Sequence, residues 1–313
     1  MSTHSPSLWK ILSETWRIIT AHTRHYSALS ALFLLPISFA AMLYPFISQP
    51  ASLHFHHLQS LFTISTPTPQ NPPASNSQLL ISILYILSAV LFSLCAYPSI
   101  TYTTFAAFYN KPVEFIPSLK SILVSFFPLL ATLFITQIIL GLIIIAFGVL
   151  MLVAYNGLVM FGLDMDYDTQ YFLAFIIVIA VILVMVLIYF QVEWYLSRAV
   201  VVLESKWGFA PLKRSSYLVK GTRKVALWMV LLFEAIGGVL LVWYLNVVAK
   251  RGGVSKEWVC VQMVVYVVLT TVLPLYAMVA NTVLFIYCKA SRGETADVIN
   301  EEAGGEYVAL PIA

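Results

Sequence analysis

The sequence predicts an all-α, polytopic membrane protein, and two observations carry this prediction. The 313 residues are 60% hydrophobic and only 10% charged, whereas soluble domains are about 45–50% apolar and about 25% charged. No Asp, Glu, Lys or Arg occurs between Arg24 and Lys111, or between Lys120 and Asp164. Because lipid offers the backbone no hydrogen-bond partner outside its own helix, such long uncharged stretches predict membrane-spanning helices.

The composition excludes several other classes of protein. The 17 Lys and Arg residues nearly balance the 14 Asp and Glu residues and form no basic stripe, so we expect no nucleic-acid partner. A disordered chain would be rich in charge. Cys95, Cys260 and Cys288 lie in apolar segments without metal-ligand spacing, so they are interpreted as packing residues.

The first element is a cytoplasmic amphipathic segment, residues 1–26. Plotted at 100° per residue, Leu8–Ala21 has one apolar and one polar half, which is typical of a helix lying on a membrane. Trp9 and Trp16 suit the headgroup boundary, while Lys10 and Arg17 suit contacts with anionic lipid phosphates. The alternative is a helix packed on the spans of the protein itself, and the sequence favours neither.

Five uncharged or nearly uncharged apolar runs are predicted to span the bilayer. They are residues 28–47, 79–100, 171–191, 225–248 and 258–288. A sixth run, 121–163, is about 64 Å long as a helix, which is enough for one crossing or two. Because turn residues are absent between Gln137 and Val153, we expect one crossing near 121–141, continued as an apolar helix or bent segment.

The distribution of Lys and Arg predicts the orientation. With six spans, most basic residues fall on one side, in 1–26, around Lys111, in the basic connection 196–224 and in the tail 289–313. The other side carries the Pro-rich loop 48–78 and a short basic turn near Lys250. The positive-inside rule therefore predicts cytoplasmic termini, in an endoplasmic reticulum, other endomembrane or plasma membrane location that the sequence does not distinguish.

The basic connection is also a predicted contact with anionic lipid headgroups. The residues expected to make these contacts, besides those of the first helix, are Lys213, Arg214, Lys220, Arg223 and Lys224.

The spans are expected to form a single integral membrane domain, residues 1–313, built as three hairpins. Each hairpin is preceded by a cytoplasmic amphipathic segment: Leu8–Ala21, then 114–120, then 209–224, where Pro211 suits a first helical turn. Gly141 and Gly148 share a helix face and are expected where two helices pack closely.

Two short stretches carry a resemblance to a known family. The runs LWKIL and ETWR (8–12 and 14–17) and the run APLKRSSYLVKG (210–221) resemble a plant family of multi-pass membrane proteins of unknown function. That family is distantly similar to the membrane domains of bacterial glycerophosphodiester phosphodiesterases. The resemblance implies six helices, and it implies no phosphodiesterase activity because the soluble catalytic domain is absent.

Glu234 is the most informative residue, because a carboxylate inside the predicted span 225–248 is costly in lipid. It is either a proton, cation or substrate site, or a protonated side chain hydrogen-bonded to Asn281 or Gln137 on another helix. We favour the second hypothesis because no second acid accompanies it at mid-depth. A continuous polar cavity that reaches Glu234 would reverse this preference.

No metal or cofactor is expected. Asp164, Asp166 and Asp168 begin like a calcium loop, but Thr169 and Phe175 replace the Gly and the acidic ligand that such a loop needs. Metal binding is a minor alternative for the outer-loop histidines, which are His54, His56 and His57.

Three classes of function remain. We favour a non-enzymatic structural, lipid-associated or partner-binding membrane protein, whose partner would be a cytosolic protein. A transporter or channel for a small solute or lipid, using Glu234, is the alternative. An intramembrane enzyme is least supported, since the sequence offers no catalytic residues: it has no HExxH, no GxSxG and no phosphate-binding Gly loop.

Overall fold

A computed structural model describes residues 7–48, 76–111, 115–160, 170–250 and 255–294, and all regular structure in these ranges is helical. The helices are α1 (Leu8–Ala21), α2 (Thr23–Leu29), η1 (Ser30–Leu34), α3 (Leu35–Ser48), α5 (Asn76–Phe108), α6 (Phe115–Met160), α7 (Gln170–Glu193), α8 (Ser197–Glu204), α9 (Ala210–Val219), α10 (Arg223–Lys250) and α11 (Lys256–Ser291).

Within the described ranges, six helical stretches are long and apolar enough to cross a membrane, which confirms the predicted fold class. They are Thr23–Pro45, Leu79–Phe108, Ile116–Gly157, Tyr171–Glu204, Arg223–Val248 and Glu257–Ser291. The ambiguous run after Lys120 is one continuous helix as far as Met160, so a two-crossing hairpin does not form there.

The first span begins at Thr23, inside the predicted segment 1–26, and contains a π-helical turn. In this turn the N–H of Leu35 donates to the carbonyl of Ser30, five residues back. Pro36 follows immediately and has no N–H for the carbonyl of Leu32, so the α-helical pattern is interrupted at this point.

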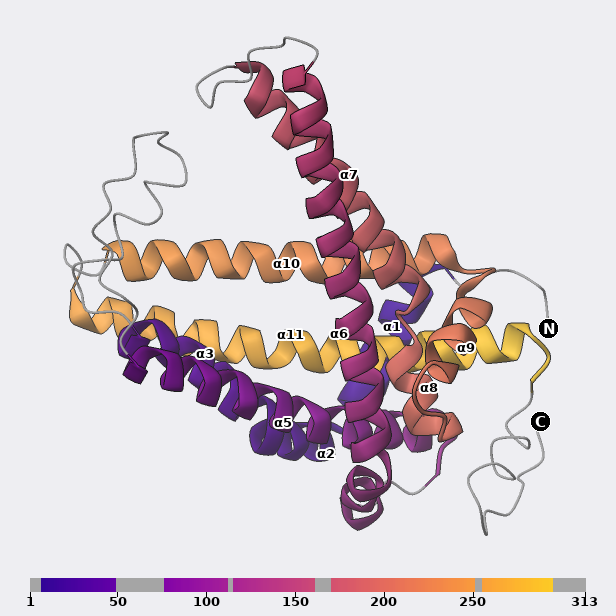
Figure 1. Cartoon of the computed structure of the whole chain (residues 1–313). Coiled ribbons are helices and arrows are strands. Elements are labelled where there is room, and N and C mark those ends of the chain that lie inside the picture. Colours follow the sequence, from indigo (N-terminus) through magenta and orange to yellow (C-terminus); the bar gives the residue numbers. More distant parts are fainter. Residues whose placement is uncertain (1–6, 49–75, 112–114, 161–169, 251–254, 295–313) are drawn as a thin grey trace.

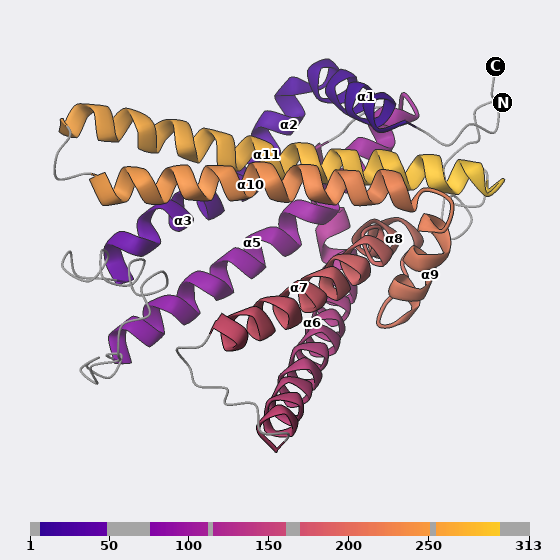
Figure 2. The same cartoon turned by 90° about the horizontal axis from the view of Figure 1, so that it is seen from above.

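The hairpins are not parallel to one another. In Figures 1 and 2, α10 and α11 lie side by side along their length, and α3 and α5 run beside them at a slant. Helix α6 instead runs steeply across the direction of α10 and α11 in both views, and α7 does so in Figure 1 but slants much like α5 in Figure 2. The short helices α8 and α9 gather with α1 near the C-terminal half of α11, at one end of the molecule.

The protein core lies at this same end. The C-terminal half of α11 is buried, including Val279, Leu284 and Phe285. Ala199 and Val200 of α8 are buried in the same hydrophobic cluster. The outer parts of α6 and α7, by contrast, expose large apolar side chains around most of their surface. A helix of this kind is stable only where lipid surrounds it.

The amphipathic helix α1 has the predicted bounds, and it packs on the protein by one face. Ile11 and Ile18 are buried against the bundle, and the hydroxyl of Tyr276 on α11 donates to the carbonyl of Leu12 across 2.5 Å. The opposite face of α1, with Trp9 and Trp16, is exposed.

The other two predicted amphipathic segments differ from each other. The connection 196–224 folds into α8 and α9, and Pro211 stands in the first turn of α9 as expected. Residues 115–120 are instead the first turns of the long helix α6, and Glu114 lies outside the described residues. The second hairpin therefore has no separate helix before it in the part of the chain described.

Candidate functional site: a polar cavity between five helices

A cavity of about 720 Å³ lies between α5, α6, α7, α10 and α11, and α8 closes one end of it. Its lining is mostly apolar but includes hydroxyl, amide and charged side chains. Among them are Tyr97, Thr136, Gln137, Gln191, Arg198, Glu234 and Asn281. All three residues of the predicted intramembrane polar site, Glu234, Asn281 and Gln137, therefore line one cavity.

Helical periodicity explains why these positions share the cavity. On α6, Leu129, Thr132, Thr136 and Leu140 follow one another at spacings of three or four residues, so they form a single stripe. On α11, Pro274, Ala277 and Asn281 form a similar stripe. Each helix turns one narrow, partly polar face to the cavity.

Glu234 has a different partner from either of those predicted. The side-chain amide of Gln191, on α7, donates to Oε1 of Glu234 across 3.0 Å. Both residues are exposed, so Glu234 faces an open cavity instead of being enclosed between helices. The expectation that Asn281 or Gln137 hydrogen-bonds Glu234 is wrong, because the helix rotation places Gln191 next to the carboxylate.

Asn281 makes one hydrogen bond and leaves an acceptor unused. Its Nδ2 donates to the backbone carbonyl of Tyr195 across 2.7 Å, which fixes the orientation of the amide. Asn281 is only 2% exposed, and its Oδ1 has no hydrogen-bond partner among the described residues. A buried acceptor without a donor is costly, so such an oxygen marks a place where a ligand or water can donate.

The turn between α7 and α8 positions Arg198 at the cavity. Ser215 on α9 fixes this turn from both sides: its hydroxyl donates to the carbonyl of Glu193 at 2.7 Å and accepts from the N–H of Leu196 at 3.1 Å. Arg198 then follows in the first turn of α8, with its guanidinium 5.2 Å from the centre of the Tyr97 ring.

The cavity therefore contains one cationic and one acidic side chain. Arg198 and Glu234 both line it, and neither belongs to any ion pair found within the described ranges. Neither charge is therefore neutralised by an oppositely charged side chain in this part of the protein. The arrangement is suited to a ligand that carries charge of both signs, or to a hydrated solute.

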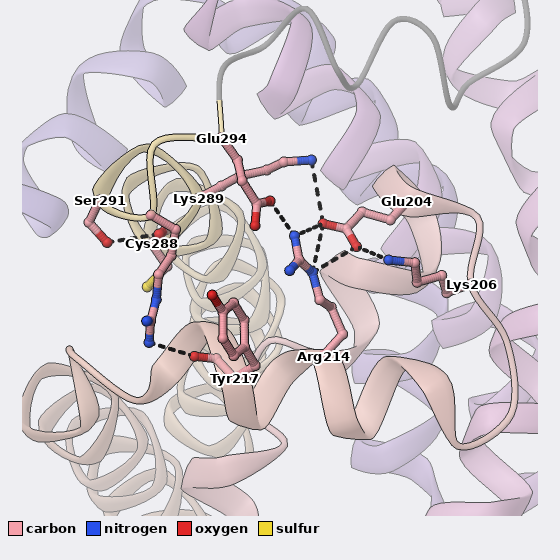
Figure 3. A network of polar contacts seen from close by, with 9 residues as sticks. Glu204, Lys206, Arg214, Tyr217, Cys288, Lys289, Ser291 and Glu294 are labelled. Atoms are coloured by element: carbon pink, nitrogen blue, oxygen red, sulfur yellow. Dashed lines mark hydrogen bonds and ion pairs between the residues drawn. The ribbon is translucent and has the colours of Figure 1, made fainter.

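A second group of charges lies outside the cavity and holds α8, α9 and α11 together (Figure 3). The carboxylate of Glu204 is buried and accepts hydrogen bonds from both Nε and Nη2 of Arg214 at 3.1 Å. Lys206 approaches it at 3.0 Å and Lys289 at 3.4 Å. Arg214 also pairs with Glu294, just beyond α11.

These contacts change the assignment of Arg214. Burial by itself lowers the pKa of its guanidinium, but hydrogen bonds to Glu294 and Glu204 raise that pKa overall. Arg223 similarly pairs with the buried carboxylate of Glu193 at 2.6 Å. Arg214 and the exposed Arg223, both expected at lipid headgroups, therefore also form ion pairs within the protein.

The remaining predicted headgroup residues lie on the surface. Five of them are exposed: Lys10, Arg17, Lys213, Lys220 and Lys224. Lys10 also lies 5.3 Å from the centre of the Tyr287 ring, and Arg17 pairs with Glu14. Trp9 and Trp16 are 78% and 62% exposed.

The other candidate features contribute less. A hollow of about 380 Å³ beside α9 contains a single charged residue, Lys213. No cluster of three metal-ligating side chains occurs in the described part of the chain, and the predicted acidic turn and outer histidines lie outside it. A Cβ added at Gly141 or Gly148 would meet nothing within 4 Å outside the backbone of its own helix, so the close packing expected there is absent.

Sequence reasoning missed Gln191, Arg198 and Tyr97 as cavity residues. Gln191 was treated as the end of a span, and Arg198 as part of a basic connection. One signal was available for two of them: Gln191 ends the predicted span 171–191, and Arg198 follows seven positions later, just beyond the turn after α7.

The fold and the cavity define the class of protein: an all-helical membrane protein with six candidate spans and a polar cavity between them. The family model described as Domain of unknown function (DUF8558) matches residues 5–310, and the chain belongs to this family. No curated protein and no solved structure matches the chain.

Proposed function

We propose that this protein binds a small solute or a lipid in the cavity and transports it, without catalysing a reaction. The observation that supports this function best is the polar cavity that reaches Glu234. Its volume of about 720 Å³ lies within the range of small-molecule sites, about 300–1,000 Å³. We prefer the transporter hypothesis to the structural one because this cavity reaches Glu234 and includes further charged and polar side chains.

The structural alternative accounts less well for Glu234. A carboxylate that serves only helix packing would be enclosed and shared between helices. Glu234 is exposed and accepts one hydrogen bond, from Gln191, on one of its two oxygens. A carboxylate facing a cavity within an apolar span is typical of a substrate or ion site.

The proposed orientation has both termini in the cytoplasm of the cell. The exposed Lys213 of α9 and the exposed Lys10 of α1 lie at the same end of the molecule, which supports a single basic face. We place this face against anionic headgroups of an endomembrane, with Trp9 and Trp16 at the boundary and a cytosolic protein as a further partner.

The finer family relationship is also a proposal. The runs 8–12, 14–17 and 210–221 support a relationship to the plant multi-pass family and, distantly, to the membrane domains of bacterial glycerophosphodiester phosphodiesterases. The first and last of these runs form α1 and α9, which surround the same end of α11.

A pair of glycine variants on α6 tests the proposed function. Gly141 lines the cavity and Gly148, two turns further along the same helix, does not, while a Cβ at either position meets nothing within 4 Å. Gly141→Phe should fill the cavity and reduce the amount of ligand that co-purifies with the full chain, measured by native mass spectrometry. Gly148→Phe should retain the wild-type amount. Equal retention by both variants, or no ligand on the wild-type protein, would overturn the proposal.

A further inference from the structure

We infer that the ligand of the cavity is a lipid with a zwitterionic headgroup, whose anion binds Arg198 and whose N–H-bearing ammonium binds Glu234 and Asn281. This inference rests on the proposed function and specifies the class of ligand. Three observations lead to it: the two charges of opposite sign, the unused oxygen of Asn281, and the apolar wall of α6.

Arg198 supplies the anion-binding part of the site. Arg198 is exposed and lines the cavity, and its guanidinium lies 5.2 Å from the centre of the Tyr97 ring. A guanidinium held in this way presents N–H donors along its edge, which match the oxygens of a phosphate or carboxylate. The turn fixed by Ser215 and Asn281 holds the start of α8, and so the backbone of Arg198, at the cavity.

Glu234 and Asn281 supply the cation-binding part. Gln191 donates to Oε1 of Glu234, so Oε2 remains available to accept from a ligand. The buried Oδ1 of Asn281 needs a donor, and none of the described residues provides one. A primary ammonium has three N–H groups and can satisfy both acceptors, whereas a quaternary ammonium has none.

Ligands with charge of one sign fit the cavity poorly. A simple anion at Arg198 would meet the carboxylate of Glu234 within the same cavity, and a simple cation at Glu234 would meet the guanidinium. A zwitterion neutralises both side chains and leaves no net charge at the site, which matters because unbalanced charge is costly in an apolar surrounding.

The apolar wall indicates that the zwitterion is carried by a lipid. Leu133, Leu140 and Ile144 continue the cavity stripe along α6, and Ile144 is 51% exposed. The cavity therefore continues from its polar end onto apolar surface that faces lipid. An acyl chain can follow this wall while the headgroup occupies the polar end, whereas a water-soluble zwitterion would leave the wall uncovered.

The experiment measures retention of defined lipids by the full-length protein in nanodiscs or by native mass spectrometry. The probes are phosphatidylethanolamine, with a primary ammonium, phosphatidylcholine, with a quaternary ammonium, and phosphatidylglycerol, with no cation. Soluble phosphoethanolamine is added in competition to distinguish a lipid source from a free solute. We expect phosphatidylethanolamine to be retained at least tenfold more than either other lipid, and phosphoethanolamine to compete weakly.

Variants connect this preference to the residues. Glu234→Gln and Arg198→Gln should each remove the preference for phosphatidylethanolamine. Glu257→Gln and Arg24→Gln, at exposed charges away from the cavity, should retain it. Asn281 also donates a hydrogen bond to a backbone carbonyl, so Asn281→Ala is compared with Asn246→Ala on α10, which removes a similar hydrogen bond. A thermal unfolding curve of each variant separates loss of binding from loss of fold.

The outcomes separate the two proposals. Equal retention of the three lipids, all displaced by Gly141→Phe, would overturn the headgroup inference and support the proposed function. Strong competition by phosphoethanolamine would overturn the lipid part and support the zwitterion. Absence of any retained ligand on the wild-type protein would overturn the proposed function itself.

Discussion

Asn281 on α11 donates its amide N–H to the carbonyl of Tyr195 across 2.7 Å. This hydrogen bond joins α11, the most buried of the six candidate spans, to the turn between α7 and α8. The same side chain lines the cavity, and its buried Oδ1 has no hydrogen-bond partner among the described residues. One residue therefore holds the turn that positions Arg198 and also forms part of the cavity wall. Because of this double role, the folded core and the cavity depend on each other.

Glu234 is the first residue to test by mutation. Glu234→Gln should fold normally, because Gln191 can still donate to the amide oxygen of the new side chain. It should nevertheless lose ligand binding or transport, since it can no longer balance a cation. Glu234→Leu should lose function as fully. A complementation or transport assay with correctly localised protein measures both, and full activity of Glu234→Gln would restore the helix-packing interpretation.

Glu204 should be important for stability and not for the cavity. Glu204→Gln removes the carboxylate that pairs with Lys289, which is only 3% exposed, and leaves Arg214 with Glu294 alone. We expect a loss of about 3–5 kcal/mol in the free energy of unfolding, as when one partner of a buried ion pair is removed. Thermal unfolding in detergent measures the change, with the exposed Glu257→Gln as the matched control. Similar melting temperatures for both variants would contradict this role of the network.

The two faces of α1 should respond differently to truncation. Ile11 is fully buried, so Ile11→Ala removes apolar contacts in the core and should cost about 2–5 kcal/mol of stability. Trp9 is exposed, so Trp9→Ala should leave the unfolding midpoint almost unchanged. Trp9→Ala should instead weaken quenching of the protein's tryptophan fluorescence by headgroup-level lipid quenchers. Equal destabilisation by the two substitutions would show that α1 has no free face.

The orientation is testable by cysteine accessibility on a cysteine-free background. Thr3→Cys, Leu310→Cys and Lys220→Cys should be labelled from the cytosolic side, and Gln70→Cys from the opposite side, because the positive-inside rule places the basic segments in the cytosol. Labelling of Gln70→Cys and Lys220→Cys from the same side would refute the six-span orientation.

Much of the fold follows from the sequence because apolar length and periodicity are local properties. Leu8–Ala21 was predicted to the residue, since Ser7 accepts from the N–H of Lys10 at its start and the chain turns at His22. The α8 helix was not anticipated: its apolar run of Ala199, Val200 and Val201 is short and lies among charges.

The cavity was predictable only in part. Its members Glu234, Asn281 and Gln137 stand out because polar residues are rare in apolar spans. The choice among possible partners of Glu234 depends on how each helix is rotated and at what angle it crosses its neighbours. Gln191 lies 43 positions from Glu234, and no pattern within either helix specifies that contact.

The length of α6 determines how the protein meets its bilayer. Its apolar stretch of 42 residues is about 63 Å long, roughly twice the hydrocarbon thickness of about 30 Å. An over-long apolar helix relieves this mismatch by tilting, and α6 does run steeply across α10 and α11 (Figures 1 and 2). Remaining within hydrocarbon requires a tilt of about 60° from the membrane normal. A thicker bilayer reduces the required tilt, so membrane thickness should change the angle between the α6–α7 hairpin and the other helices.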